Sequence, residues 1–328
     1  MRDDRGTALA PAFDSPPGLH KIAADREGNR RMSTASAALP AITTIGFIGL
    51  GVMGEPMCGH LARRIGKTVL AFDLNPEPAA RLAEFGVKAA TLAEMARDCQ
   101  VILFSLPDGK AVQAVVAQLE PHLRPGQTLV DTSTSSVAMT RAIGARLEAK
   151  GIHYVDAPVA RTREAASRGE LSIMVGGSDA AFAHVRAILE TMGTDVTHCG
   201  PSGCGQVVKI LNNMLVFQNC GALAEAIAIG RRNGVPADKL LETMALGSGD
   251  SFALRNHGMK AMVPRNFPKR AFSTKYAMKD LSYALEMGEA AGLDIRAAQL
   301  TMVRLKETER AGFGDEYHPV LLNVVDPL

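Results

Sequence analysis

The sequence predicts an α/β domain with a parallel sheet, followed by an all-α domain, with one long helix joining the two. From residue 43 onward, short apolar runs alternate with amphipathic stretches. This alternation is typical of a parallel sheet covered by helices on both faces. After about Pro201 the strand pattern stops and only helical periodicity follows. We therefore expect domains over residues 43–201 and 202–328.

The predicted strands are short and apolar, and helical patterns lie between most of them. The strands are expected at Thr44–Ile48, Thr68–Phe72, Val101–Ser105, Thr128–Asp131, His153–Asp156, Leu171–Val175 and Asp195–His198. The intervening helices include Glu55–Ile65, Gly109–Leu119 and Val137–Lys150.

A long helix is expected from Gly203 to Arg232. Gly234 is suited to its C-terminal end, because glycine adopts the left-handed conformation that ends many helices. Pro236 then begins another helix, and helical patterns continue through Thr274–Ala291 and Ile295–Ala311.

Residues 1–42 differ from the rest of the chain. They contain several prolines and mixed charges, and they lack apolar periodicity. This composition is typical of a disordered extension, and it has neither the apolar core of a secretory signal nor the character of a transit peptide. Met32 is a candidate for the natural start of translation.

The overall composition excludes several classes of function. The chain has 328 residues, 47% hydrophobic and 21% charged, with a net charge of +2 and no Trp. This balance favours neither nucleic acid nor a membrane as partner. Five scattered cysteines and eight histidines lack metal-ligand spacing, so we expect reduced thiols, no metal and a cytoplasmic protein.

A glycine-rich turn follows the first predicted strand. Residues 49–54 read Gly-Leu-Gly-Val-Met-Gly, directly before a helix. Gly49 permits the tight turn, Gly51 lets the backbone approach a pyrophosphate, and Gly54 allows the helix to pack on the strand. The helix N-terminus then offers free N–H groups to phosphates. Leu50, Val52 and Met53 complete the predicted dinucleotide-binding turn.

Asp73 ends the second predicted strand, about twenty residues after the glycines. A carboxylate there is suited to accept hydrogen bonds from an adenosine ribose, and it would repel a 2′-phosphate. The sequence therefore predicts a Rossmann-type domain that binds NAD in preference to NADP. The alternative is that Asp73 only caps the following helix.

Four segments resemble the β-hydroxyacid dehydrogenase family, which includes 3-hydroxyisobutyrate dehydrogenase and tartronate semialdehyde reductase. The resemblance covers nearly all of residues 43–325. The segments are residues 49–57, residues 156–159 with 169–177, residues 203–213, and Lys279-Asp280-Leu281.

The resemblance implies a Rossmann-type N-terminal domain, a long interdomain helix and an all-α domain that helps to form a homodimer or homotetramer. It implies that Lys209 is the catalytic acid/base and that Asn213 lies beside it in the substrate site. It also places Leu106, Pro107, Thr134 and Lys279 near the dinucleotide.

The residues themselves support a role for Lys209. A carbonyl that receives a hydride also needs a proton. Desolvation early in a mostly apolar helix can lower the pKa of a lysine, so that it can exchange this proton. Asn213 lies one helical turn later, on the same face. The alternatives are that Lys209 extends to solvent with Asn213 as an ordinary polar residue, and that Lys279 and Asp280 form a solvated pair.

The chain departs from its relatives after Asp156-Ala157-Pro158-Val159. Most members continue with Ser-Gly-Gly, whereas this chain has Ala160-Arg161-Thr162. Arg161 and Thr162 predict a site for an anionic group, which favours a substrate such as 3-sulfolactaldehyde or succinic semialdehyde. The alternatives are that Arg161 or Arg163 only makes a salt bridge across the domains, and that the substrate is 3-hydroxyisobutyrate or tartronate semialdehyde.

A second departure is His318-Pro319, where relatives more often have Ser-Ala; it either reshapes the pocket rim or alters a subunit contact. Two other classes of function stay open. One is a non-catalytic dinucleotide-binding subunit, which would need neither Lys209 nor Asn213, so their presence argues against it. The other is a related enzyme on the same scaffold, such as an imine reductase or a decarboxylating dehydrogenase; imine reductases typically lack the lysine at this position, so Lys209 counts against them.

Overall fold

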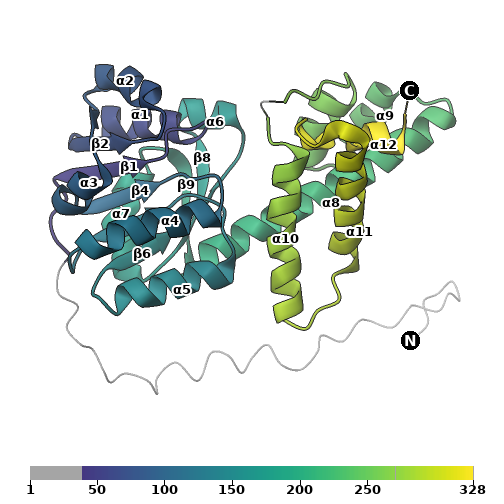
Figure 1. Cartoon of the computed structure of the whole chain (residues 1–328). Coiled ribbons are helices and arrows are strands. Elements are labelled where there is room, and N and C mark those ends of the chain that lie inside the picture. The colour runs from purple at the N-terminus through teal and green to yellow at the C-terminus, as the bar shows by residue number, and fades with distance from the viewer. Residues whose placement is uncertain (1–38, 270, 328) are drawn as a thin grey trace, which may run out of the picture. The chain divides into compact units, whose positions relative to one another are not determined.

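The computed structural model describes residues 39–269 and 271–327 (Figure 1). The proposed start at Met32 and most of the predicted disordered extension lie outside the described residues. Of that extension, residues 39–42 are described, and they carry neither helix nor strand.

Within the described residues, the N-terminal half is built on a nine-stranded sheet with the order β3-β2-β1-β4-β5-β6-β8-β7, in which β9 pairs with β8. The strands are β1 (Thr44–Ile48), β2 (Thr68–Phe72), β3 (Lys88–Ala89), β4 (Val101–Phe104), β5 (Thr128–Asp131), β6 (His153–Asp156), β7 (Val159–Ala160), β8 (Leu171–Gly176) and β9 (Gly193–Gly200). All seven strands that the sequence predicts are present, and only the two-residue strands β3 and β7 were not expected.

The predicted parallel arrangement is confirmed for β1 to β6 and for the pair β8–β9. It is wrong for β8 relative to β6 and β7, because these pairs are antiparallel. A parallel connection needs a crossover of a dozen or more residues, usually a helix that packs on the sheet. Here the chain reverses through β7 and the six-residue helix α6 (Arg163–Arg168), so β8 returns in the opposite direction.

Helices lie on both faces of this sheet (Figure 1), and each face has its own core. Along β1, Ile45 and Phe47 pack into one core and Ile48 into the other, as the alternation of side chains along a strand requires. Burial on both faces explains why the predicted strands are continuous apolar runs. The helices are α1 (Gly54–Arg64), α2 (Pro76–Leu82), α3 (Leu92–Asp98), α4 (Gly109–Leu119), α5 (Val137–Glu148) and α7 (Asp179–Leu189), with short 3₁₀ turns η1 (Ala83–Phe85) and η2 (Glu120–His122).

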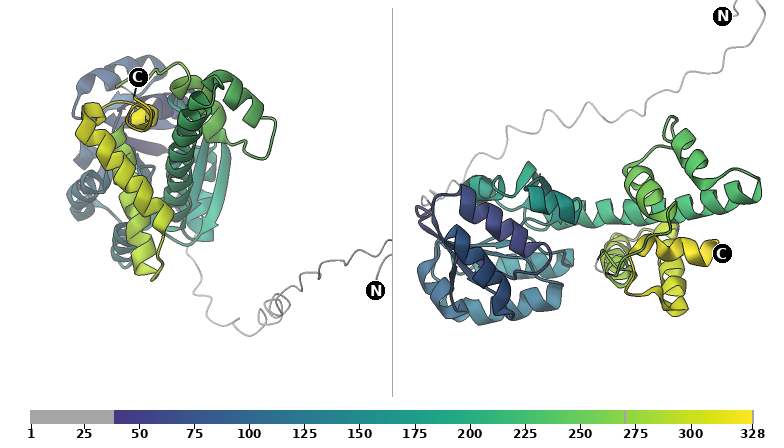
Figure 2. Two further views of the ribbon diagram at one scale, coloured as in Figure 1. Left: turned by 90° about the vertical axis from the view of Figure 1, so that its right-hand side faces the viewer. Right: turned by 90° about the horizontal axis from the view of Figure 1, so that it is seen from above.

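The C-terminal half is helical, as predicted, and α8 runs into it from the sheet-containing half as one continuous helix (Figure 2). The structure places α8 at Cys204–Arg232, one residue from the predicted start. The remaining helical elements are α9 (Ala237–Met244), the π-helical segment η3 (Leu254–Met262), α10 (Thr274–Ala290), α11 (Arg296–Thr308), the π-helical turn η4 (Glu309–Phe313), η5 (His318–Leu321) and α12 (Leu322–Val325).

The N-terminus of α8 is locked onto the sheet. The buried Asp156 carboxylate, at the end of β6, accepts hydrogen bonds from the backbone N–H groups of Gly203 (2.7 Å) and Gln206 (2.9 Å). A side chain at Gly205 would place its Cβ 2.3 Å from the carbonyl oxygen of Met174. The close approach of α8 to β8 therefore requires glycine at position 205.

None of the helices in the described part of the chain combines the length and apolar character that a membrane span requires.

We expect Gly205→Ala to destabilise the fold, because the new Cβ cannot fit without moving α8 away from β8. The expected loss of unfolding free energy in urea is about 1–3 kcal/mol, the range for overpacking a core. Gly221→Ala, on the same helix, is the matched control, since nothing lies within 4 Å of its Cβ position. It should raise stability by up to about 1 kcal/mol through helix propensity; equal behaviour of the two variants would contradict the close-approach argument.

Candidate functional site

The glycine turn between β1 and α1 has the geometry of a phosphate cradle. Gly49 has φ +89°, and its N–H donates to the carbonyl of Phe72 at 2.9 Å. A Cβ at Gly49 would lie 2.3 Å from the carbonyl oxygen of Ser105, and one at Gly54 would lie 1.9 Å from that of Gly49. A Cβ at Gly51 would meet nothing within 4 Å. Gly49 and Gly54 are thus required by the fold, whereas Gly51 leaves space beside the turn.

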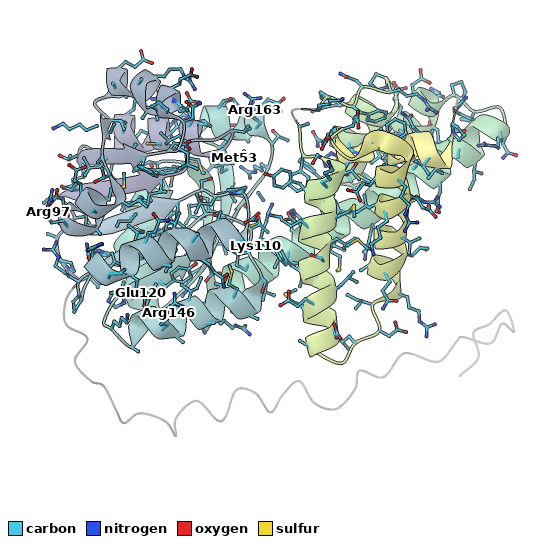
Figure 3. The ribbon with its side chains drawn as sticks, in the orientation of Figure 1. Met53, Arg97, Lys110, Glu120, Arg146 and Arg163 are labelled. Atoms are coloured by element: carbon cyan, nitrogen blue, oxygen red, sulfur yellow. The ribbon has the colours of Figure 1, made fainter. Side chains whose placement is uncertain are left out.

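This space fits the pyrophosphate of a dinucleotide. The helix α1 begins after Met53, which is labelled in Figure 3 and contributes no side-chain hydrogen bond to cap it. In the first turn, the Glu55 N–H donates to the Gly51 carbonyl (3.0 Å), and Pro56 has no N–H. The positive end of the helix dipole at this turn favours phosphate binding. Leu50 and Val52 lie in the same turn, and more than half of the Val52 side chain is exposed beside it.

Asp73 follows β2 and is held against the glycine turn. Its carboxylate accepts hydrogen bonds from the backbone N–H groups of Leu50 (2.5 Å) and Asn75 (2.8 Å). The carboxylate is thereby fixed at the carboxyl end of β2, next to the turn, where the sequence predicts an adenosine ribose. Asn75, rather than Asp73, caps the following helix α2, so the alternative of a capping aspartate is wrong.

Lys279, on α10, lies against two loops at the carboxyl ends of β4 and β5. Its ammonium donates hydrogen bonds to the carbonyl oxygens of Pro107 (3.1 Å) and Thr134 (3.4 Å). The loops are also joined directly, since the Leu106 N–H donates to the Ser133 hydroxyl (2.9 Å). The structure therefore brings together the four residues that the family resemblance places near the dinucleotide.

Lys209 and Asn213, on α8, both lie near the Asp280 carboxylate of α10. The Lys209 ammonium donates to Asn213 Oδ1 (3.0 Å), and Asn213 Nδ2 donates to Asp280 Oδ2 (2.7 Å). Asp280 Oδ1 lies 3.2 Å from the ammonium of Lys279. These contacts form a continuous polar network from Lys209 to the two loops, and we call it the lysine network (Lys209, Asn213, Asp280, Lys279).

The lysine network is withdrawn from water. Lys209 is 8% exposed and Asp280 is 1% exposed, so the alternative in which Lys209 extends to solvent is wrong. Burial lowers the pKa of Lys209, the nearby Asp280 carboxylate acts to raise it, and the like charge of Lys279 acts to lower it. An ammonium with a depressed pKa can give up its proton more readily than a lysine in water.

Two buried residues of the site were not predicted. Asp280 is adjacent to Lys279 in a segment that carries the family resemblance, but its contact with Asn213 spans 67 residues and has no local signal. Gln206 joins α8 to the Thr134 loop, since its Nε2 donates to the carbonyl of Ser133 (2.8 Å) and its Oε1 accepts from the N–H of Ser135 (3.1 Å). The spacing 206, 209, 213 along one helix face is the only sequence pattern that points to Gln206.

Arg161 makes contacts with Glu170, Thr194 and Asp195. It has φ +85°, a conformation that favours the glycine usual in relatives. Its guanidinium donates to the Glu170 carbonyl (2.6 Å), the Thr194 hydroxyl (2.9 Å) and the Asp195 carboxylate (2.5 Å). Arg161 thus forms an ion pair with Asp195, which lies in β9 rather than in the helical half, and its predicted role in binding an anionic group stays a prediction.

Thr162 has a local structural role. Its hydroxyl caps α6 by accepting from the N–H of Ala165 (3.4 Å), and it donates to the Glu164 carboxylate (2.9 Å). This hydroxyl is already engaged at both its donor and an acceptor position.

Comparison with known proteins agrees with this arrangement. Residues 44–200 match the family model described as the NAD binding domain of 6-phosphogluconate dehydrogenase. Residues 203–325 match the model described as NAD-binding of NADP-dependent 3-hydroxyisobutyrate dehydrogenase. The two models together cover nearly all of the described chain.

Several relatives are similar over most of their length. The 2-(hydroxymethyl)glutarate dehydrogenase of Eubacterium barkeri is 33% identical over 85% of this chain and 94% of its own. The 3-hydroxyisobutyrate dehydrogenase of Pseudomonas aeruginosa is 35% identical over 76% of this chain and 86% of its own. The structure of Mycobacterium tuberculosis 3-hydroxyisobutyrate dehydrogenase with L-serine is 29% identical, covers 87% of this chain and 99% of its own, and has a TM-score of 0.79.

The fold, the glycine turn and the named relatives define the protein as an NAD-dependent dehydrogenase that acts on CH–OH groups. More narrowly, the chain belongs to the β-hydroxyacid dehydrogenase family.

Gly51→Ala separates cofactor binding from folding. The new methyl group meets no protein atom, so the melting temperature should stay unchanged, while it fills the space next to the turn. We expect the Kd for NAD, measured by calorimetry, to rise at least about tenfold, which corresponds to about 1.4 kcal/mol. Gly54→Ala is the contrast, because its clash with Gly49 should lower the melting temperature. An unchanged NAD affinity in Gly51→Ala would contradict the cradle.

Arg161→Gly tests whether Arg161 binds the substrate or only forms the ion pair with Asp195. Glycine suits the positive φ, and the ion pair with Asp195 is exposed, so we expect a change in unfolding free energy within about 1 kcal/mol. KM for carboxylate substrates should change less than about threefold, because the guanidinium is already paired. A large rise in KM confined to anionic substrates would restore Arg161 as the anion receptor.

Proposed function

We propose that this protein interconverts a small anionic hydroxy acid and its aldehyde, with Lys209 as the general acid/base and Asn213 beside it in the substrate site. The single observation that carries the proposal is the buried Lys209 ammonium, which is linked through Asn213 and Asp280 to Lys279 and the cofactor-side loops. The cofactor is NAD.

In the oxidation direction, neutral Lys209 takes the proton from the substrate hydroxyl. In the reduction direction, the Lys209 ammonium donates the same proton to the carbonyl oxygen. Bound NAD supplies the hydride acceptor, and its reduced form supplies the hydride donor. Asn213 holds the Lys209 Nζ through its Oδ1, and its own amide is held by Asp280, so the base keeps one orientation through the reaction.

A carboxylate on the carbon that bears the hydroxymethyl group is the substrate feature that we favour. The named relatives act on 3-hydroxyisobutyrate and 2-(hydroxymethyl)glutarate, which share this unit. The preference for 3-sulfolactaldehyde or succinic semialdehyde depended on a free Arg161, and the ion pair with Asp195 removes that support. Tartronate semialdehyde is an alternative substrate. Association into a homodimer or homotetramer stays a prediction.

A non-catalytic dinucleotide-binding subunit is the competing function from a different class. Such a protein would gain nothing from a desolvated lysine, because burying an ammonium costs free energy that polar partners have to offset. We expect the chain to reduce NAD in the presence of 3-hydroxyisobutyrate or a related hydroxy acid, followed by absorbance of NADH. The absence of turnover with every such acid and aldehyde would favour the subunit.

Lys209→Ala should lower kcat by about 10²–10⁴-fold, the range for loss of a general acid/base, while the Kd for NAD stays within about twofold. Lys239→Ala, at an exposed position on α9, is the matched control and should leave kcat unchanged. Near-normal kcat in a folded Lys209→Ala protein would remove the proposed role.

The pH dependence of kcat/KM for oxidation reports the pKa of Lys209, which the neighbouring charges of Asp280 and Lys279 shift. Oxidation needs neutral Lys209, so kcat/KM rises with pH through its pKa. Asp280→Asn removes the negative charge that raises this pKa, so the rising limb should move to lower pH. Lys279→Gln removes a like charge and should move it to higher pH. Shifts in the same direction for both variants would contradict the assignment of the limb to Lys209.

A further inference from the structure

Gln206 is a polar residue in the first turn of α8, and it is fully buried. Its side-chain amide lies against the loop after β5 and uses both of its ends there. Nε2 donates to the carbonyl of Ser133 (2.8 Å), and Oε1 accepts from the N–H of Ser135 (3.1 Å). The amide therefore holds the backbone on either side of Thr134. Its orientation is fixed, because a flipped amide would place N–H groups against the N–H of Ser135.

The same loop is connected to the glycine turn between β1 and α1. The Ser133 hydroxyl accepts a hydrogen bond from the N–H of Leu106 (2.9 Å). Leu106 in turn borders the glycine turn, since its Cδ2 lies 3.1 Å from the position that a Cβ would take at Gly49. Contacts therefore lead from the glycine turn, through Leu106 and Ser133, to the side chain of Gln206 on α8.

Lys209 follows Gln206 by three residues on the same helix. Residues with this spacing are neighbours on the helix surface, about 4.5 Å apart along the axis. A helix with its side chains is about 10–12 Å across, so a rotation of about 10° moves a side-chain end at its surface by about 1 Å. The rotation of α8 about its own axis therefore sets where the Lys209 ammonium lies relative to the loops after β4 and β5.

Two kinds of contact hold the first turn of α8, and they restrict different movements. The Asp156 carboxylate accepts from the N–H groups of Gly203 and Gln206. N–H groups at a helix N-terminus point along the axis, so this contact fixes where the helix begins. The Gln206 amide projects from the side of the helix, so its two hydrogen bonds oppose rotation about the axis. A fixed direction for Lys209 requires both restraints.

We propose that Gln206 is a positioning residue for the oxidoreduction: its amide fixes the rotation of α8 and thereby aligns Lys209 with the dinucleotide and the substrate. The inference rests on the proposed function, because it takes Lys209 as the general acid/base. Gln206 exchanges no proton, and its neutral amide adds no charge beside Lys209. Misplacing a reacting group by about 1 Å can cost about 100-fold in rate. Loss of the Gln206 amide should therefore slow proton transfer by Lys209 and leave NAD binding at the glycine turn intact.

Gln206→Met removes both hydrogen bonds and keeps a side chain of similar length. We expect kcat for oxidation to fall about 10–100-fold, while the Kd for NAD changes less than about threefold. The rising limb in the pH dependence of kcat/KM should stay in place, unlike in Asp280→Asn and Lys279→Gln, because no charge near Lys209 has changed. A displaced limb would show that Gln206 acts on the charge of Lys209 and would overturn the inference.

Gln206→Asn is a second variant in case Gln206→Met does not fold. It keeps the amide but is shorter by one methylene group, so it cannot reach Ser133 and Ser135 together. We expect the same fall in kcat with NAD binding retained. Gln218→Met, at a half-buried position on the same helix, is the matched control and should change kcat less than about twofold. A folded Gln206→Asn protein with the kcat of the wild type would overturn the inference.

A Lys209→Ala background separates positioning from general damage to the fold. In that background, Gln206→Met should lower kcat less than about twofold further, because the group that Gln206 positions is already gone. An equal loss of kcat in both backgrounds would show a purely structural role for Gln206 and would overturn the inference. That result would leave the proposed function intact as long as Lys209→Ala alone is strongly slowed. Near-normal kcat in Lys209→Ala would contradict the proposed function itself, whatever the Gln206 variants do.

Discussion

The buried ammonium of Lys209 is the constraint on which the site depends. A charge removed from water must be compensated by polar partners, and here Asn213 provides the hydrogen bond while Asp280 provides the opposite charge nearby. Because Asp280 belongs to α10, the two helices must pack in one register for the contact to form. Lys279, one residue before Asp280, then reaches the carbonyl groups of the two loops. The contacts that compensate the charge of Lys209 thus also fix its distance from the two loops at the carboxyl ends of β4 and β5.

The position of Lys209 along the sheet is set at the beginning of α8. Asp156 accepts two N–H groups of the first turn, and Gly205 allows that turn to touch the backbone of β8. Gln206 then ties the same turn to the loop that contains Thr134. Gly205, Asp156 and Gln206 together therefore fix the start of α8 relative to the sheet. Because α8 is anchored at its start, Lys209 in its second turn has a fixed position relative to the sheet, although the whole helix is 29 residues long.

Local patterns were sufficient for much of the fold and for half of the site. Alternating apolar runs predicted seven strands because both faces of the sheet are buried, and the spacing of Lys209 and Asn213 predicted their shared helix face. The reversal at β8 was not predicted, since it depends on how a short connection packs and not on the strand pattern. Asp280 and Arg161 show the same limit. The partner of Asp280 is 67 residues away, and that of Arg161 lies on β9, 34 residues away.

The sequence by itself determined the kinds of groups present: a glycine turn able to approach a pyrophosphate, an acid after the second strand, and a lysine with an amide one turn later. These depend on spacing within one element, where backbone geometry decides which residues share a face. Only the tertiary structure decided which charges are free and which are paired. It buried Lys209 and joined it to Asp280, and it occupied Arg161 with Asp195. The physical reason is that the state of a charge depends on its desolvation and on partners brought from distant elements, and neither is encoded in local spacing.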